Sequence, residues 1–345
     1  MVTPGAGRPA VMADVARLAG VSHQTVSRVL NEHPNVRPET RNRVLRAIAE
    51  LSYRRNALAR GLVRRRSRVL GVVSFDTTLF GPASTLYGIE RAARAAGYWV
   101  SIATLERIDR AGVLAAVDAL AEQSVEGIIV IAPQLAAAGA LHSLPAGLPA
   151  VAVEAGFDAC APVVGVDQVA GARLAVEHLL ALGHQTVWHI AGPHDWLEAR
   201  DRIEGWRAAL QRAGRPVPAM IAGDWSARSG YAAGQALARQ AGVTAVFAAN
   251  DQMALGLLRA LHERGVRVPE EISVVGFDDI PEAEFLIPPL TTVRQDFDEV
   301  GRRSMAALLH LLEKAGTEPP EHSVTSVAPT FVLRSSTAPP GFTTH

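Results

Sequence analysis

Hydrophobic and polar positions divide the chain into two parts with different periodicities. Up to about residue 55, apolar residues recur at helical spacing in three short segments. The first segment, MADVARLAG, places Val15, Leu18 and Ala19 on one face and stops at Gly20, a natural helix terminator. The pattern predicts a small all-α head made of short helices.

The second segment, GVSHQTVSRVLN (20–31), predicts a helix that begins after Ser22, a good N-cap. The third, RPETRNRVLRAIAELSY, predicts another helix. The side chains expected to face inward are Val26, Val29 and Leu30 in the second helix and Val44, Leu45, Ile48 and Leu51 in the third. Two helices joined by a short turn containing Gly form a helix-turn-helix, so residues 1–55 are expected to be such a unit.

From about residue 68, apolar runs of strand length alternate with amphipathic helices. The eight expected strands are RVLGVVS, YWVSIAT, EGIIVIA, PAVAVE, TVWHIAG, AMIAGD, TAVFAAN and ISVVGFD. Continuous apolar strands separated by helices are typical of parallel sheets covered on both faces. The pattern therefore predicts an α/β body over residues 68–340 with two doubly wound parallel-sheet lobes, followed by a tail at 341–345.

Ligands of such sheets bind at the carboxyl ends of the strands. In this chain those ends carry polar and aromatic side chains: Phe75 and Asp76, Glu154, Asn250 and Asp251, and Asp278 and Asp279. We expect a ligand site there.

Composition supports a globular protein, since 48% of the 345 residues are hydrophobic. Cys160 is the single cysteine, which excludes a disulfide within the chain and favours a reducing compartment. No apolar run has the length of a signal peptide or a membrane span. We expect a cytoplasmic protein with no membrane partner.

The net charge of zero conceals an asymmetry between the two parts. Residues 1–68 contain fourteen Arg, no Lys and four acidic residues, a charge of +10, and the remainder carries −10. A basic head on an acidic body is typical of a nucleic-acid-binding module. A solvated basic face with no partner is the alternative.

The segment DVARLAGVSHQTVSRVLN resembles the N-terminal signature of the lactose/galactose repressor (LacI/GalR) family of bacterial transcription factors. Further motifs follow in the family's order: YRRNALARGLVRRRSRVLGVV, AGDWSARSG, FAANDQMALGLLRAL, ISVVGFDDIPEAEFLIPPLTTVRQDF and VLRSS. The resemblance extends from Val11 to about Ser336. It implies a helix-turn-helix head, a hinge helix and linker at 56–67, and a periplasmic-binding-protein-like body that binds an effector and dimerises.

For the head, the resemblance implies that His23 and Gln24 read base edges and that Arg28 reaches a base one turn later. Gln can pair with adenine and Arg with guanine in the major groove. The same helix exposes Ser27, and Ser22, Thr25 and Asn31 are expected to hold phosphates, which position the protein without specifying sequence.

In the hinge, which begins at Asn56, Ala59 and Leu62 match the family positions that enter the minor groove. Leu62 would wedge between base steps and kink the DNA. An ordinary linker leucine is the alternative.

For the body, the resemblance implies that Arg202, Asn250 and Asp278 contact a sugar and that Trp225 stacks on it. The other expected effector residues are Phe75, Asp76 and Leu79 in the first lobe, Glu154 where lactose-type members carry Asp, and Phe297 on the pocket floor. Phe75 and Ile131 replace polar residues of lactose-type members, so the expected effector is galactoside-like with an undefined substituent.

Other functions fit less well. No phosphate-binding GxxxxGK[ST], GxSxG or dinucleotide fingerprint indicates an enzyme, and no cofactor is expected. Four histidines, at 178, 184, 189 and 194, have no metal-ligand spacing and are interpreted as surface or capping residues. An extracytoplasmic sugar-binding protein is disfavoured by the basic head.

The sequence thus predicts a homodimeric repressor that a sugar releases from pseudo-palindromic operator DNA. A dimer is preferred because the tail has no Leu heptads. The alternatives left open are another saccharide or a sugar phosphate as effector, a ligand acting as co-repressor, and a sugar-binding module with a vestigial DNA head.

Overall fold

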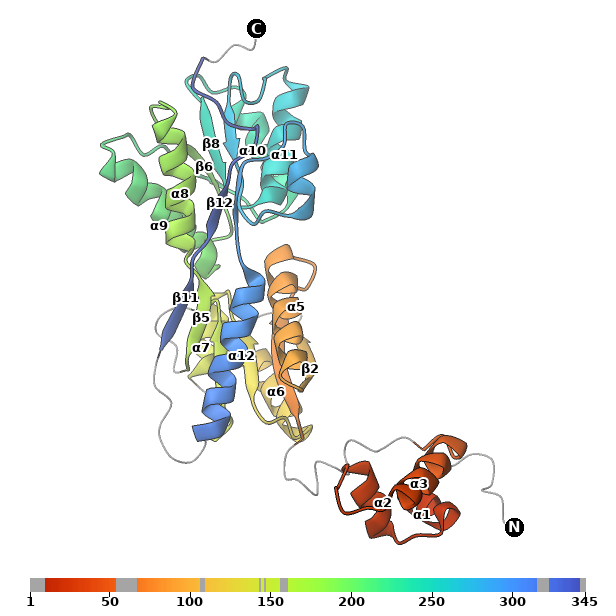
Figure 1. The fold of residues 1–345 in the computed structure, drawn as a ribbon. Helices are drawn as coiled ribbons and strands as arrows, with labels where there is room; N and C mark the ends of the chain where they lie inside the picture. Colours follow the sequence, from red (N-terminus) through yellow and green to blue (C-terminus); the bar gives the residue numbers. More distant parts are fainter. Residues whose placement is uncertain are drawn as a thin grey trace. The chain divides into compact units, whose positions relative to one another are not determined.

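The computed structural model describes residues 10–53, 67–105, 109–142, 144–145, 147–155, 161–314 and 323–341. Contacts divide the chain into two units, Met1–Ser67 and Arg68–His345 (Figure 1). We call the first the head and the second the body, and each is described by itself.

The head has three helices, α1 (Met12–Ala19), α2 (His23–Leu30) and α3 (Pro38–Glu50). Their buried core consists of Val15, Ala16, Ala19, Val26, Val29, Val44 and Ala47. As the sequence predicts, α1 ends at Gly20 in the left-handed conformation, with φ of 62°. The Ser22 hydroxyl caps α2 by accepting the Thr25 N–H at 3.2 Å.

Two predictions for the head core are wrong. Leu18 and Leu45 are 46% and 49% exposed. In α1 the small Ala16 is buried beside Val15, and the Leu18 side chain lies at the edge of the buried face, where solvent reaches it. In α3 the buried stripe is centred on Val44, and Leu45 lies about 100° around the helix from it, which points it to solvent.

The first lobe of the body is a six-stranded sheet with strand order β11-β5-β4-β3-β1-β2, and all its pairings are parallel. Its strands are β1 (Val69–Phe75), β2 (Trp99–Leu105), β3 (Ile128–Ile131), β4 (Ala150–Val153), β5 (Val163–Val166) and β11 (Val324–Val327). Its helices are α5 (Phe80–Ala95), α6 (Arg110–Glu122), α7 (Leu135–Leu141) and α12 (Phe297–Lys314). Separate apolar clusters join α6 and α7 to one face and α5 and α12 to the other.

The second lobe has a parallel four-stranded sheet, order β7-β6-β8-β9. Its strands are β6 (Trp188–Ala191), β7 (Ile221–Ala222), β8 (Ala245–Ala248) and β9 (Ser273–Val275). Its helices are α8 (Gln168–Ala181), α9 (Leu197–Arg212), α10 (Ala227–Leu237), α11 (Asp251–Glu263) and the 3-10 helix η1 (Pro281–Phe285). One apolar cluster holds α10 and α11 on one face, and another holds α8 and α9 on the opposite face. Both lobes are doubly wound, as predicted.

The chain crosses between the lobes three times: from β5 to α8, from β10 (Thr292–Arg294) to α12, and from β11 to β12 (Thr330–Val332), as Figure 1 shows. Strands β10 and β12 pair antiparallel. All eight predicted strands are present, but β5, β10, β11 and β12 were not predicted. Their apolar pattern is interrupted by Gly165 in β5 and by polar residues in β10, β11 and β12.

Candidate functional site

A cavity of about 190 Å³ lies between the two lobes of the body. The first lobe contributes residues 78–82 at the start of α5, and the second contributes the start of α9 and the carboxyl ends of its strands. Five predicted effector residues line this cavity together: Leu79, Arg202, Trp225, Asn250 and Asp278. We call it the effector cavity.

Arg202 on α9 is almost fully buried, at 2% exposure. Its Nε donates to Gln168 Oε1 at 2.9 Å, and its Nη1 donates to the Ala249 carbonyl at 2.5 Å. Its Nη2 lies 3.7 Å from Glu198 Oε2 and 3.8 Å from Asp278 Oδ1. One guanidinium therefore serves two carboxylates at distances longer than a hydrogen bond.

Asp278 follows β9 in a strained backbone conformation, with φ of 109°. Its N–H donates to Val293 O at 2.8 Å, and its Oδ1 accepts Gln295 Nε2 at 2.7 Å. Burial raises the pKa of the Asp278 carboxyl to about 7, although the nearby Arg202 guanidinium acts to lower it. Because non-glycine residues with positive φ cluster at functional sites, this strain supports a role in binding. Asp76, Glu154 and Trp225 share the feature, although so do residues away from the cavity such as Glu32 and Ser124.

Asn250 is the N-cap of α11, and its Oδ1 accepts the Met253 N–H at 2.9 Å. Its Nδ2 donates to the Trp225 carbonyl at 3.0 Å and to Gln252 Oε1 at 2.9 Å. Asn250 therefore orients Trp225 as well as lining the cavity.

The Trp225 ring lies nearly perpendicular to the Trp196 ring, at 75° with centroids 5.6 Å apart. The Arg202 guanidinium lies 5.3 Å from the Trp225 ring centroid. The Trp225 Nε1–H is buried and has no hydrogen-bond acceptor among the residues that the structure describes. A ligand oxygen could accept from it, since buried donors are rarely left unpaired.

The other predicted effector residues lie outside the lining of this cavity. Phe75 packs against Trp196 with centroids 6.1 Å apart, and Phe297 meets Phe80 edge-on at 5.9 Å. The Asp76 carboxylate accepts hydrogen bonds from the backbone and hydroxyl of Thr78, which does line the cavity. These residues support the wall and do not form it.

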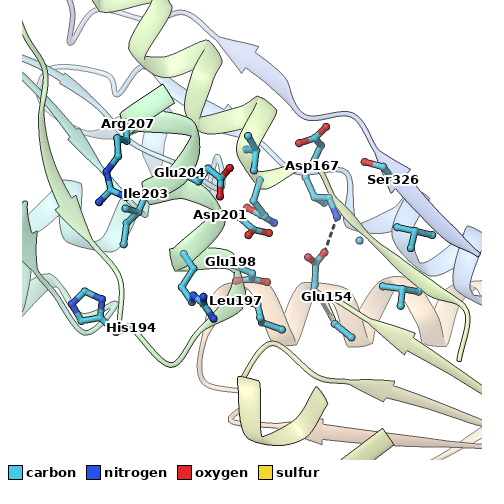
Figure 2. Close-up of a pocket in the computed structure, with 18 of the residues that line it drawn as sticks. Glu154, Asp167, His194, Leu197, Glu198, Asp201, Ile203, Glu204, Arg207 and Ser326 are labelled. Carbon is cyan, nitrogen blue, oxygen red and sulfur yellow. Dashed lines mark hydrogen bonds between the residues drawn. The ribbon is translucent and has the colours of Figure 1, made fainter. Parts of the chain in front are cut away.

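Glu154 lines a second, larger cavity of about 630 Å³ (Figure 2). Its Oε1 accepts the Val166 N–H at 2.9 Å. Burial, reinforced by the negative charge of Glu198, raises the pKa of Glu154 to about 8. Glu198 lines both cavities, so it connects Glu154 to the effector cavity.

On the head, α2 buries Val26 and Val29 and exposes His23, Gln24 and Arg28. The Ser22, Thr25, Ser27 and Asn31 side chains bond to one another or to the helix backbone. The helix therefore presents a polar face of the kind that enters a major groove. Asn56, Ala59 and Leu62, like the rest of 54–66, lie outside the described residues.

Two of the four histidines that were predicted to be surface or capping residues lie in the interior of the body. His184 and His189 are buried, and His189 stacks on Phe247 with centroids 4.8 Å apart. Burial lowers the pKa of His189 to about 4, so it is held neutral in the core. Among the described residues, no group of three or more His, Cys, Asp or Glu side chains could hold a metal ion.

Comparison with known proteins accounts for both units. Residues 11–56 match the family described as bacterial regulatory proteins, lacI family, and residues 176–337 match a periplasmic binding protein-like domain. The lactose operon repressor of Escherichia coli (strain K12) is 39% identical over 306 residues, covering 88% of this chain and 85% of that protein. The chain belongs to the lacI family.

A second relative and a solved structure agree. The ribose operon repressor of Escherichia coli (strain K12) is 34% identical over 307 residues, covering 87% of this chain and 92% of that protein. The crystal structure of the lac repressor dimer bound to operator and the anti-inducer ONPF superposes with a TM-score of 0.87 at 36% identity, covering 96% of this chain and all of that one. The two repressors are named for different operons, lactose and ribose, so family membership leaves the effector undefined.

Sequence reasoning missed several residues at or beside this cavity, among them Trp196, Glu198 and Gln295 in its lining and Gln168 next to Arg202. Gln168 Nε2 donates to Gln295 Oε1 at 2.8 Å, and the pair links Arg202 to Asp278. Glu198 precedes Arg202 by four residues on α9, a helical ion-pair spacing that could have found it. The two glutamines have no such local signal, because their bond joins distant segments.

None of the helices that the structure describes is long and apolar enough to cross a membrane.

Proposed function

We propose that this chain is a transcriptional repressor that binds operator DNA as a homodimer and is released when a sugar occupies the effector cavity. The observation that carries the proposal is the exposed polar face of α2 on a strongly basic head, joined in one chain to a two-lobed body with a polar cavity. The DNA partner locates this action in the cytoplasm. Its LacI-family relatives are repressors and not enzymes by name.

In this proposal His23, Gln24 and Arg28 read base edges, while Ser22, Thr25, Ser27 and Asn31 position the head on phosphates. Asn56, Ala59 and Leu62 supply the minor-groove contact, with Leu62 as the wedge.

In the body, Arg202, Asp278 and Trp225 hold the sugar, while Leu79 meets it from the first lobe. Asn250 and the outer residues Phe75, Asp76, Glu154 and Phe297 shape the site. The Arg, carboxylate and Trp set suits a hydroxyl-rich ring with one apolar face. We infer a galactoside-like effector that acts by induction.

Exposed apolar side chains on the second lobe support a dimer. Phe285 and Ile287 are 77% and 94% exposed, and Leu255 on α11 is 41% exposed. Large exposed apolar side chains mark interaction sites. A dimer also presents two heads to the two halves of a pseudo-palindromic operator.

The test uses fluorescence anisotropy with full-length protein and an operator selected from a random duplex pool. We expect specific binding that a sugar from a mono- and disaccharide panel reverses. A sugar that tightens binding would make the ligand a co-repressor. A protein that binds sugar but selects no duplex would show that the head is vestigial.

A further inference from the structure

The effector cavity holds more acidic than basic side chains. Glu198 and Asp278 line it, and Glu154 lies next to Glu198 in the adjoining cavity. Among the described residues that line the effector cavity, Arg202 is the one basic side chain. Three carboxyl groups therefore share one guanidinium.

The Arg202 guanidinium is poorly placed to bind an anion. Its Nε and Nη1 already donate to Gln168 and to the Ala249 carbonyl, at 2.9 and 2.5 Å. The Phe277 ring covers it, with the guanidinium carbon 3.9 Å from the ring centroid. The remaining Nη2 lies between Glu198 and Asp278, so a phosphate that approached it would meet both carboxylates.

Burial already makes negative charge costly here. It raises the pKa of Glu154 to about 8 and that of Asp278 to about 7, and it raises the pKa of Glu198 as well. A carboxyl group keeps its proton to higher pH when burial and neighbouring carboxyls make its ionised form unfavourable. A ligand anion would meet the same penalty, because it must be desolvated beside the same carboxyls.

An uncharged polyol meets no such penalty. A carboxyl group accepts a hydrogen bond from a sugar hydroxyl whether or not it is ionised, and a protonated carboxyl can also donate one. The unpaired Nε1–H of Trp225 offers the complementary donor to a hydroxyl or ring oxygen. The cavity therefore offers carboxyl groups and an indole N–H to hydroxyls, which can both donate and accept hydrogen bonds.

We propose that Glu198, together with Glu154 and Asp278, makes the effector cavity selective for uncharged, hydroxyl-rich sugars and excludes phosphorylated and carboxylated ones. Glu198 is the specificity-determining residue, because it lines both cavities and adds the carboxylate that Arg202 cannot fully neutralise. The inference rests on the proposed function of this cavity as a sugar site, and it narrows the class of sugar.

The test compares matched ligands at equal concentration on full-length protein by thermal shift, since a ligand of the folded state stabilises it by RT ln(1 + [L]/Kd) and so raises the Tm more when it binds more tightly. The probes are D-galactose, D-galactose 6-phosphate and D-galacturonate, with the same series for D-glucose and with lactose as a disaccharide. We expect at least one uncharged sugar to raise the Tm and its 6-phosphate and uronate to bind at least about tenfold more weakly.

Glu198→Gln should reduce that discrimination by about tenfold while operator binding, measured by anisotropy, is retained. The matched control is Glu204→Gln, on the same helix. Glu204 is exposed and lines the larger cavity and not the effector cavity, so its variant should keep the wild-type ratio.

Each other outcome has a separate meaning. A phosphate or uronate that binds wild type as tightly as its parent sugar overturns the charge selection but leaves a sugar-responsive repressor. An unchanged ratio in Glu198→Gln removes the role of Glu198. If no member of any series binds, the sugar-responsive function fails, and the charge selection fails with it.

Discussion

Arg202 and Asp278 meet in the interior of the body with Nη2 and Oδ1 3.8 Å apart, and two glutamines connect them more tightly than this direct contact does. Arg202 donates to Gln168, Gln168 donates to Gln295, and Gln295 donates to Asp278, at 2.9, 2.8 and 2.7 Å. Gln168 begins α8 and Gln295 follows β10, so they lie on two of the three segments that cross between the lobes. We therefore expect a ligand that engages Arg202 or Asp278 to act on hydrogen bonds that join these crossings, and so to move the lobes relative to one another.

Replacing Asp278 should separate sugar response from DNA binding. Asp278→Asn keeps the size and tolerates the positive φ, but it removes the carboxyl group that we propose accepts ligand hydroxyls. We expect sugar binding to weaken by roughly 1.5–3 kcal/mol, the range for hydrogen bonds to charged groups, while operator binding persists. Operator release is measured by anisotropy during a sugar titration.

The neighbouring Asp279 provides the control. Its carboxylate pairs with Arg294 and Arg334, each at 2.6 Å, which ties the loop to later segments of the chain. Asp279→Asn should lower the Tm and leave the sugar midpoint unchanged. Release of DNA from Asp278→Asn at the wild-type sugar concentration would show that Asp278 is not a ligand residue.

Arg28 should contribute to sequence preference and not only to affinity. Arg28→Ala is expected to cost about 1–3 kcal/mol on the preferred operator and to relax base preference at one position of each half-site. The control is Arg46→Ala, an exposed residue on α3, which should change affinity about equally for all duplexes. Binding to a panel of single-base operator variants measures both effects. Identical preference profiles for the two variants would contradict the assignment of α2.

Much of this architecture follows from local pattern. The eight predicted strands are apolar runs that can be recognised in the local sequence. The head helices begin at caps and end at residues that the sequence also shows. Trp225, Asn250 and Asp278 meet at one edge of the second sheet because they follow its parallel strands, but Arg202 lies on α9 and Leu79 comes from the first lobe, so the family resemblance was needed to single them out.

The parts not predicted depend on tertiary contacts. Strands β10 and β12 exist because they pair with each other, and Gln168 and Gln295 are identified only by a bond between segments distant in sequence. Leu18 and Leu45 were wrongly predicted to be buried. An apolar residue at the edge of the buried face of a helix fits the helical spacing of apolar residues but stays exposed.

The stability of the body should fall as pH rises. Asp251 is fully buried, accepts the Ile280 N–H and the Thr292 hydroxyl at 2.9 and 2.6 Å, and has its pKa raised to about 8 by burial and then by Asp278. In the unfolded chain an Asp loses its proton near pH ~3.9. Between about pH 4 and 8 the folded state therefore binds more protons, so the free energy of unfolding decreases with pH across this window and levels above it.

Thermal unfolding from pH 5 to 9 measures this slope. Asp251→Asn removes one titrating group, so it should make the slope shallower by up to about 1.4 kcal/mol per pH unit, whatever its effect on the absolute Tm. Glu154 and Asp278 titrate in the same direction and should leave a residual slope. An Asp251→Asn profile parallel to wild type would show that Asp251 does not hold its proton in the folded state.

Gly192 should fix the position of the Trp225 ring. A Cβ on Gly192 would lie 2.3 Å from the Trp225 ring, far inside van der Waals contact, so the indole would have to move. That ring packs against Trp196 and Arg202 at the effector cavity. Gly192→Ala is therefore expected to cost about 1–3 kcal/mol of stability through overpacking and to weaken sugar binding, while operator affinity without sugar stays unchanged.

Gly139→Ala on α7 is the control, since nothing lies within 4 Å of its added Cβ, and alanine should be neutral or stabilising there. Thermal unfolding gives the stability change, and a sugar titration at a temperature where both variants are folded gives the affinity. If Gly192→Ala lowered the Tm but kept the wild-type sugar midpoint, the ring could move without loss of ligand contact, and Trp225 would have to be removed from the binding site.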